Sequence, residues 1–418
     1  MNNNINIKLV GMGVAVIAAL SACSDVVDYT LPDKYANSGA PEITAIYNAQ
    51  DTGCVNAITS GMLNQMIHIK GHNLANITAV SFNGVPVDVR SQAYGETNDC
   101  WLTIPRVIPE RVTDSLVFET QQGKTAIHFP VSIPEMSVSG LANEFALKGD
   151  HVQVMGDYFD LYGFSDTTNT ATSTIIISNA DSAYTQAVKA DSITETYMGI
   201  IIPDDCPDNS LITFSWKQLG KTMTKTIPYR MSKNLMFGQF GSDVSWWDSA
   251  FKKCLTDGNS NGDPISLGYK FIRIKGTYDA WSWSSDGISY TWTNEDAAQN
   301  PQKYVLKFEV YTNSSTPFMN YGNNGADGSK NGGYLFTFNG LPGATGNRNQ
   351  FDPITTFGLQ NTYGHWRTVS VPLEDVLQGG KVSAGQTVPL EIVLQPNTAN
   401  AWTVDHCFGQ FRIEPKTY

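Results

Sequence analysis

Short segments in which apolar and polar residues alternate, each ended by Gly, Asn or Pro, recur along most of the chain. Alternation with a period of two predicts half-buried β-strands, and from residue 231 onward helical periodicity is absent apart from a short turn at 373–377. We therefore predict an all-β fold made of β-sandwiches. The clearest predicted strands are 66–74 (MIHIKGHNL), 80–87 (VSFNGVPV), 101–105 (WLTIP), 303–311 (KYVLKFEVY), 334–338 (YLFTF) and 367–373 (RTVSVPL).

Chain length limits the number of domains, and charge limits the kinds of binding partner. A chain of 418 residues corresponds to two to four domains at about 100 to 200 residues each. Only 16% of the residues are charged, 27 basic against 39 acidic. A nucleic-acid partner needs a positive surface, so it is disfavoured, and neutral partners are favoured.

Residues 1–22 have the layout of a lipoprotein signal peptide. One basic residue, Lys8, precedes an apolar segment at 9–20, and the segment ends in Leu-Ser-Ala before Cys23. That segment is too short to span a bilayer, which takes about 20 apolar residues. The motif resembles the lipobox of bacterial lipoproteins. The resemblance implies that residues 1–22 are removed and that Cys23 carries the lipid.

The residues after the lipobox bear on where a lipoprotein is sorted in the cell. Ser24, Asp25 and Asp28 partly resemble the acidic signal that sends some lipoproteins to the outer face of the outer membrane. Residues 23–40 are polar and lack periodicity, which indicates a lipidated tether. We expect a lipid-anchored protein of the outer membrane that faces the cell exterior.

Five cysteines remain besides Cys23, and an odd number in an oxidising compartment leaves at least one of them unpaired. Two share one predicted domain and two share another, so either pair could form a disulfide, and spacing does not decide it. None has the spacing of a zinc site. They are Cys54, Cys100, Cys206, Cys254 and Cys407.

Residues 41–133 resemble the immunoglobulin-like fold called IPT or TIG. The resemblance rests on Gly-x-Asn-Leu at 71–74, Val-x-Phe-Asn-Gly at 80–84 and a later strand that ends at Pro105. A second copy at 134–230 repeats the order of strand, glycine and aromatic residue at 152–159. The resemblance implies two spacer domains, so we expect Trp101 and Trp216 to lie in their cores.

Residues 231–418 form a different module, because seven of the nine tryptophans lie between Trp246 and Trp402. The segments 366–373 and 404–413 resemble closing strands of carbohydrate-binding β-sandwiches. The order of lipobox, two IPT copies and aromatic sandwich resembles the surface glycan-binding proteins of bacterial polysaccharide-utilisation loci. That resemblance implies a non-catalytic, cofactor-free protein that captures polysaccharide for an outer-membrane importer and a surface endo-glycanase.

The segment 278–292 is the richest in aromatic residues. Asp-Gly at 286–287 predicts a two-residue type I′ turn, which places Trp283 opposite Tyr290 and Trp281 opposite Trp292. Because side chains alternate along a strand, all four rings then share one face. Such a face either stacks on sugar rings or covers a core, and both alternatives stay open.

Further aromatic residues outside this segment are also candidates for the glycan site. Trp246 and Trp247 are adjacent, so in an extended segment one ring enters the core and the other is exposed. We expect Trp366 to pack, and we leave Tyr363 and Trp402 as candidates. Candidate polar partners of a sugar are Asp279, Asn294, Glu295, Gln299 and the Asn-rich segment 320–331.

A long aromatic surface without a basic cluster favours an extended neutral β-glucan, either xyloglucan or mixed-linkage β-glucan. No catalytic motif of a metalloprotease, a serine hydrolase or a phosphate-binding loop is present, so we do not expect an enzyme. Two alternatives remain: a surface glycoside hydrolase with a β-sandwich catalytic domain, and a protein-binding adhesin. The segment 257–263 resembles half a calcium loop, but Gly268 replaces the expected glutamate, so we expect a turn and no metal.

Overall fold

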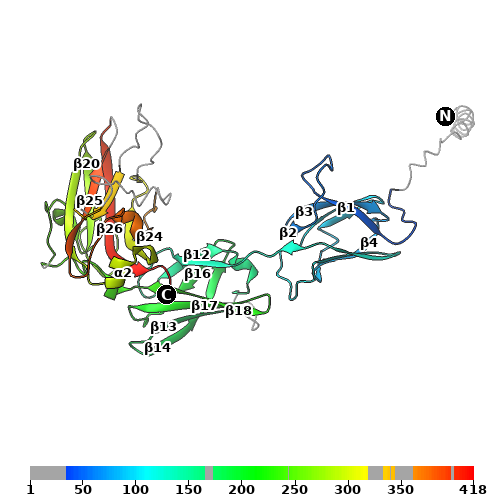
Figure 1. The fold of residues 1–418 in the computed structure, drawn as a ribbon, viewed down its shortest axis with the longest axis horizontal. Helices are drawn as coiled ribbons and strands as arrows, with labels where there is room; N and C mark the ends of the chain where they lie inside the picture. Colours follow the sequence, from blue (N-terminus) through cyan, green and yellow to red (C-terminus); the bar gives the residue numbers. More distant parts are fainter. Residues whose placement is uncertain are drawn as a thin grey trace, which may run out of the picture. The chain divides into compact units, whose positions relative to one another are not determined.

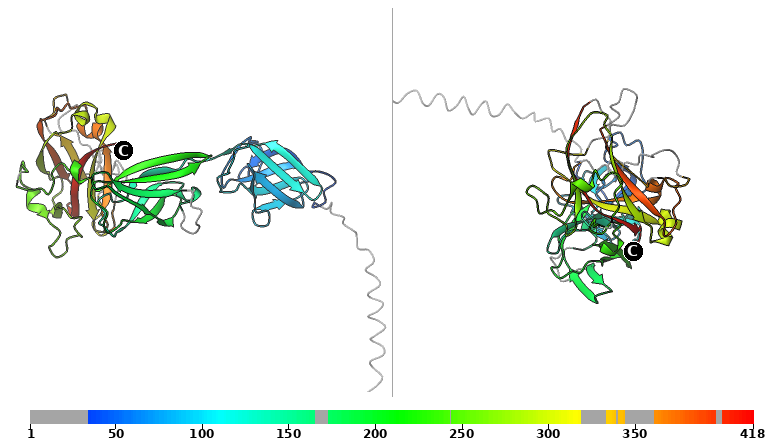
Figure 2. Two further views of the ribbon diagram at one scale, coloured as in Figure 1. Left: turned by 90° about the horizontal axis from the view of Figure 1, so that it is seen from below. Right: turned by 90° about the vertical axis from the view of Figure 1, so that its left-hand side faces the viewer.

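The computed structural model describes residues 34–164, 173–242, 244–318, 333–338, 340–343, 361–396 and 400–418. The chain divides into two units between Ile133 and Pro134. Both are built almost entirely from β-sheets (Figures 1 and 2), which confirms the predicted all-β class. Among the residues that the structure describes, no helix has the length and apolar character needed to cross a membrane.

The first unit is a sandwich of two four-stranded sheets with a core that includes Ile67, Leu102 and Phe118. One sheet has the order β1-β3-β7-β6, the other β5-β4-β8-β9, and β10 pairs with β2 in parallel. Their bounds are β1 Glu42–Asn48, β2 Gly61–Met62, β3 Met66–His72, β4 Ile77–Phe82, β5 Val85–Pro86, β6 Ala93–Gly95, β7 Asp99–Thr103, β8 Ser115–Thr120, β9 Gly123–His128 and β10 Val131–Ser132.

The second unit begins with residues 134–230, again a pair of four-stranded sheets, ordered β11-β12-β16-β15 and β14-β13-β17-β18. The strands are β11 Ser137–Leu141, β12 His151–Asp157, β13 Thr174–Asn179, β14 Tyr184–Val188, β15 Ala190–Ile193, β16 Tyr197–Ile201, β17 Ser210–Gln218 and β18 Lys221–Tyr229, and the 3-10 helix η1 spans Phe159–Leu161.

The two immunoglobulin-like modules share one local geometry. A Cβ at Gly71 would lie 1.9 Å from the carbonyl oxygen of Glu42, and a Cβ at Gly156 would lie 2.0 Å from that of Ser137. In each module this glycine faces a β-bulge in the neighbouring strand. Only glycine permits such a close backbone approach, which is the physical reason for the repeated strand and glycine pattern in the sequence.

The two spacer tryptophans differ in burial. Trp216 is buried, as expected. The expectation that Trp101 is a core residue is wrong, because its ring lies half-buried outside the apolar core and stacks on His68, with ring centroids 4.3 Å apart. Its neighbours in β7, Cys100 and Leu102, point inward instead, as the alternation of a strand requires.

Residues 231–418 form a larger sandwich of a five-stranded sheet, β19-β20-β26-β22-β24, and a three-stranded sheet, β21-β25-β23. Phe308, Phe336 and Phe411 fill the space between the sheets. The elements are η2 Ser232–Asn234, η3 Lys252–Cys254, β19 Leu255–Thr256, β20 Phe271–Tyr278, β21 Ser284–Thr291, α2 Glu295–Gln299, η4 Pro301–Lys303, β22 Tyr304–Thr312, β23 Gly333–Phe338, β24 Arg367–Pro372, α3 Leu373–Leu377, β25 Thr387–Gln395 and β26 Trp402–Pro415.

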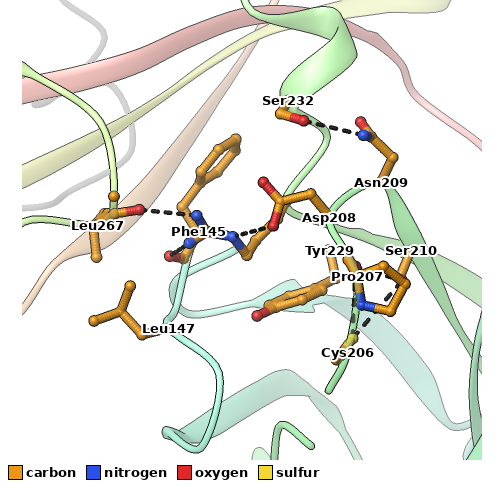
Figure 3. Close-up of polar contacts among 12 residues, drawn as sticks. Phe145, Leu147, Cys206, Pro207, Asp208, Asn209, Ser210, Tyr229, Ser232 and Leu267 are labelled. Atoms are coloured by element: carbon orange, nitrogen blue, oxygen red, sulfur yellow. Dashed lines mark hydrogen bonds and ion pairs between the residues drawn. The ribbon is translucent and has the colours of Figure 1, made fainter. Parts of the chain in front are cut away.

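Arg230 joins this module to the preceding one, as Figure 3 shows for the residues around it. Its guanidinium donates to the carbonyl of Phe145 at 2.7 Å, to the carbonyl of Leu267 at 3.0 Å and to the carboxylate of Asp208 at 2.8 Å. Phe145 also packs in a small apolar cluster with Leu267 and Trp366. Charged and apolar contacts therefore both hold the two modules together.

All five cysteines of the described residues are free thiols. Neither of the two pairs left open by the sequence forms a disulfide in this structure. Three of the thiols are buried and two are half-buried, so most of these side chains serve as small apolar groups.

Candidate functional site

The connections at one end of the C-terminal sandwich carry exposed aromatic residues. Register brings the strand termini of this end together, because Tyr278 pairs with Trp402, Thr312 with His406 and Ser284 with Leu394. We call this end, formed by residues 279–283, 313–318, 361–366, 396 and 400–401, the loop end.

Trp281 lies in the tight connection from β20 to β21 and its side chain is 58% exposed. Its backbone is left-handed, with φ of 59°. The Trp281 amide donates to the carbonyl of Pro396 at 2.8 Å, and the Ser282 amide donates to the carbonyl of Asp279 at 3.1 Å. These bonds hold the indole in solvent in a fixed backbone conformation.

Tyr363 lies in the turn before β24 and is 70% exposed. Its backbone is also left-handed, with φ of 53°. The Tyr363 amide donates to Asn361 Oδ1 at 2.7 Å, and the Gly364 amide donates to the carbonyl of Thr312 at 2.9 Å. Thr312 Oγ1 donates to Asn361 Oδ1 at 3.0 Å, so a buried threonine anchors this turn.

Trp281 and Tyr363 therefore share one end of the sandwich and one kind of backbone strain. The strands that carry them, β20 and β24, are separated by β26 and β22, which places the strand ends about 14 Å apart at 4.7–4.9 Å per strand. A left-handed conformation is costly for a bulky side chain and persists where surrounding bonds enforce it. Two such exposed rings make this end of the sandwich the candidate binding surface.

A cleft of about 610 Å³ opens beside Tyr363. Gly364, His365 and Tyr311 line it from the C-terminal module, and His151 and Gln153 line it from the preceding module. This volume lies within the range of small-molecule sites in proteins. The cleft therefore begins at the residues that follow Tyr363 in the chain, and neither Tyr363 nor Trp281 lines it.

Trp247 is exposed on the outer face of β21, and Trp246 packs inward. The Trp247 amide donates to the carbonyl of Gly287 at 2.7 Å, and a Cβ at Gly287 would lie 2.8 Å from Trp247 Cε3. Trp246 stacks on Phe240 with ring centroids 5.8 Å apart. Trp246 is half-buried against the core and Trp247 is exposed, so the two rings lie on opposite sides of the segment as expected.

The predicted hairpin at 286–287 is wrong. Asp286 and Gly287 lie in the middle of β21, where they pair with Ile392 and Glu391 of β25. Asp286 is fully buried and accepts hydrogen bonds from the backbone amides of Asp248 at 2.8 Å and Phe251 at 3.1 Å. The turn falls instead at 279–283, because long-range pairing outweighs the local preference of Asp-Gly.

Because residues 286–287 lie within β21, the four rings of the predicted face do not lie together. Trp292 is fully buried and Tyr290 half-buried, and they pack on each other with ring centroids 5.5 Å apart. Trp292 also contacts Phe338 in the core. Trp283 is half-buried immediately before β21. Of the four rings, only that of Trp281 is exposed to solvent.

The predicted polar partners are also divided. Asp279 lies in the loop of Trp281, but Asn294, Glu295 and Gln299 follow the opposite end of β21. There Asn294 Oδ1 accepts from the Ala297 amide at 3.0 Å as the N-cap of α2, and Gln299 donates to Glu295 at 2.9 Å. The segment 320–331 lies outside the described residues.

Two anchors of the site were missed from the sequence, Asn361 and Pro396. An Asn side chain often accepts a hydrogen bond from the backbone amide two residues later and so forms an Asx turn. Asn361 could have been predicted from the sequence as such a turn residue. The carbonyl of Pro396 carries no local signal, because its partner Trp281 is 115 residues earlier in the sequence.

Nearby charges are paired within the protein. Arg273 donates to Asp405 at 2.8 Å and to Asp263 at 2.6 Å. Burial alone would raise the pKa of Asp405, but the bonds from Arg273 outweigh burial and lower it. In the described residues no group of three or more His, Cys, Asp or Glu is placed to hold a metal ion. The 257–263 segment is a turn in which Asp257 accepts from the Asn259 amide.

Comparison with known families assigns this module. Residues 229–415 match the family model of the surface glycan-binding protein B xyloglucan binding domain. The match confirms the predicted resemblance to surface glycan-binding proteins, and it makes this a non-catalytic glycan-binding protein rather than an enzyme.

Several solved structures are similar to the whole chain. Surface glycan-binding protein PbSGBP-B from Prevotella bryantii is 19% identical, with 91% of this chain and 100% of that chain covered and a TM-score of 0.45. SGBP-B from a complex xyloglucan utilization locus in Bacteroides uniformis is 16% identical, with 90% and 99% covered and a TM-score of 0.43.

A third similar structure is SGBP-B of the Bacteroides ovatus mixed-linkage glucan utilization locus in complex with a mixed-linkage heptasaccharide. It is 11% identical, with 89% of this chain and 74% of that chain covered and a TM-score of 0.25. No curated protein matches the sequence.

Proposed function

We propose that the protein captures an extended neutral β-glucan, with xyloglucan favoured over mixed-linkage β-glucan, by stacking sugar rings on Trp281 and Tyr363. One observation carries the proposal: both rings are exposed at the same end of the sandwich, in backbone conformations fixed by hydrogen bonds. The family description of the module names xyloglucan binding and supports that choice of ligand.

The chemistry of the loop end suits a neutral polysaccharide. One face of a pyranose ring presents C–H bonds, which pack against a flat aromatic ring, while hydroxyl groups at the rim bond to polar side chains. None of residues 279–283, 313–318 and 361–366 is Lys or Arg. These described segments therefore offer no Lys or Arg to the carboxylate of an acidic sugar. Fixed rings also reduce the conformational entropy lost on binding.

Native affinity gels of the full chain test the ligand and the site together. Gels are cast with xyloglucan, barley-type β-glucan, mannan, xylan or laminarin. We expect retardation by xyloglucan that falls strongly in Trp281→Ala and Tyr363→Ala and persists in Tyr94→Ala, which removes an exposed aromatic residue of the first unit. Circular dichroism and thermal unfolding confirm that each variant is folded.

Trp247 decides how far the surface extends. If Trp281→Ala and Trp247→Ala abolish binding but Tyr363→Ala does not, the glycan follows the outer face of β21 rather than the loop end. If the folded Trp281→Ala and Tyr363→Ala proteins both bind like the wild type, the proposed site is wrong. If no polymer retards the wild type, the β-glucan proposal fails.

We also propose that Cys23 carries a lipid that anchors the protein at the external face of the outer membrane, where captured glycan passes to an importer and a surface endo-glycanase. The lipobox sequence at 20–23 supports this. Metabolic labelling with a fatty acid analogue should be lost in Cys23→Ala, and protease added to intact cells should digest the wild-type protein. A protease-resistant protein would contradict the external location.

A further inference from the structure

In the first unit a cysteine contacts a histidine, and the histidine in turn contacts an aspartate. This unit does not contain the proposed glycan site. Cys54 Sγ is 3.3 Å from His68 Nδ1, and His68 Nε2 is 2.7 Å from Asp99 Oδ1. His68 and Asp99 lie on the paired strands β3 and β7, and Cys54 lies in the connection that follows β1. Nucleophile, base and orienting carboxylate in this order are the arrangement of an activated thiol.

The hydrogen bonds decide which nitrogen of His68 carries the proton. Burial would raise the pKa of Asp99, but the bonds from Lys70 and His68 outweigh burial and lower it, so this carboxylate is ionised and accepts. His68 Nε2 therefore donates to Asp99, which leaves the lone pair of Nδ1 facing Cys54 Sγ. The thiol proton points at a base.

Packing fixes the imidazole in this orientation. His68 is 6% exposed, and its ring stacks on Trp101 with centroids 4.3 Å apart and an interplanar angle of 12°. Lys70 contacts the same oxygen of Asp99 at 2.6 Å, which holds the carboxylate in place. A base that cannot rotate away from Sγ stays available for proton transfer.

The other thiols of the described residues have no such partner. Burial raises the pKa of Cys100 to about 12 and also raises those of Cys206, Cys254 and Cys407. Cys254 is half-buried, like Cys54, but its Sγ contacts the carbonyl of Ala250 at 3.6 Å. Cys254 is therefore a matched internal control for Cys54.

We propose that Cys54 is an activated thiol that exchanges with low-molecular-weight disulfides and so forms a modification site of the first unit. Sγ attacks one sulfur of the disulfide while His68 Nδ1 accepts the thiol proton. A new S–S bond forms, the original S–S bond breaks, and the leaving thiolate takes the electron pair and then the proton. The disulfide is the oxidant, so the exchange is balanced.

The surroundings of Cys54 favour this exchange over acyl transfer. A tetrahedral oxyanion needs free amide donors close to the nucleophile. The nearest following amides, those of Val55 and Asn56, already donate to Asp51 Oδ2 at 3.0 Å and 2.8 Å. Thiol exchange requires no such donors, so the arrangement suits a reactive thiol and not a protease.

The test incubates the full chain with oxidised glutathione at neutral pH and follows the mixed disulfide at each cysteine by peptide mass spectrometry. We expect Cys54 to be modified about tenfold faster than Cys254, the size of effect that a positioned base supplies at its lower end. His68→Gln should remove this difference and leave the rate at Cys254 unchanged. Asp99→Asn should slow Cys54 because the imidazole loses its orienting partner.

Several results of this experiment would contradict the proposed reactivity of Cys54. Modification of Cys54 at the rate of Cys254, or an unchanged Cys54 rate in folded His68→Gln, overturns the proposal. If His68→Gln does not fold, the comparison of Cys54 with Cys254 in the wild type and the rate in Asp99→Asn still decide it. A loss of reactivity at Cys54 and Cys254 together would indicate a general structural effect, and it would also count against the proposal.

Discussion

Glu144 Oε2 lies 2.8 Å from the guanidinium of Arg412, 268 residues later in the chain, and both side chains are buried. Glu144 belongs to the second immunoglobulin-like module and Arg412 to the glycan-binding module. Glu144 Oε1 also accepts from Lys307 at 2.6 Å, and Arg412 contacts Glu309 at 3.0 Å. The two modules are therefore joined by a buried network of charges as well as by Arg230.

Removing the charge of Glu144 should destabilise this junction. Glu144→Gln takes one carboxylate away from buried Lys307 and Arg412, which keep Glu414 and Glu309 as partners. We expect the loss of these charged hydrogen bonds to lower the unfolding free energy by about 2 kcal/mol. Denaturant unfolding measures it. Glu135→Gln, at an exposed site in the same module, is the matched control and should change stability by less than about 0.5 kcal/mol. Equal effects of the two variants would contradict a structural role for the network.

His406 predicts loss of stability in mild acid. Burial lowers the pKa of His406 from 6.5 to about 4, so between these values the unfolded chain binds a proton that the folded chain does not. Stability is therefore highest above pH 6.5 and falls by about 3 kcal/mol as pH falls to 4. Unfolding midpoints at pH 7, 6, 5 and 4 measure the slope.

Two variants isolate this contribution. His406→Gln removes the titrating group, so its stability should depend less on pH between 6.5 and 4, although its stability at pH 7 falls because the contacts to Tyr334 and Thr316 change. His365→Gln, at an exposed histidine of the same module, should keep the wild-type slope. An unchanged slope in His406→Gln would show that other groups cause the acid sensitivity.

Asp286 should be a stability residue and not a turn residue. Asp286→Ala leaves the amides of Asp248 and Phe251 without their acceptor and opens a buried cavity, so we expect a loss of about 3 kcal/mol in unfolding free energy. Asp279→Ala, at an exposed site in the true turn, should have little effect. If Asp286→Ala were as stable as Asp279→Ala, the placement of Asp286 within β21 would be wrong.

Asn361 should tune affinity without touching the ligand. Asn361→Ala removes the acceptor of the Tyr363 amide and frees the turn, so the ring must be ordered again on binding. We expect xyloglucan affinity to weaken about threefold, compared with about tenfold, or 1.4 kcal/mol, for Tyr363→Ala. Isothermal titration with a xylogluco-oligosaccharide compares them. A loss in Asn361→Ala as large as that in Tyr363→Ala would point to direct contact.

The sequence predicted most strands well but not the register around the site. The segments 303–311 and 367–373 correspond to β22 and β24, because strict alternation survives the tertiary context there. Asp-Gly at 286–287 has a strong local turn preference, yet pairing with β25 and two buried amides outweigh it. Local sequence cannot report those partners, since β25 begins about 100 residues later.

The same limit applies to the candidate aromatic residues. Alternation separated Trp246 from Trp247 correctly, but it could not distinguish exposed Trp281 from buried Trp292, because their exposure depends on where the chain turns. The arrangement of Cys54, His68 and Asp99 was equally hidden. His68 and Asp99 come together through the pairing of β3 with β7, and spacing along the chain carries no trace of it.

β26 runs from Trp402 at the loop end to Pro415 near the network of Glu144, and it pairs with β20 on one side and β22 on the other. A polymer held at the loop end and pulled by flow would load this strand along its length. Its hydrogen bonds to both neighbours would then share the force in shear instead of opening one after another. If glycan binds at the loop end as proposed, the central strand provides a mechanical path from that end to the junction with the preceding module.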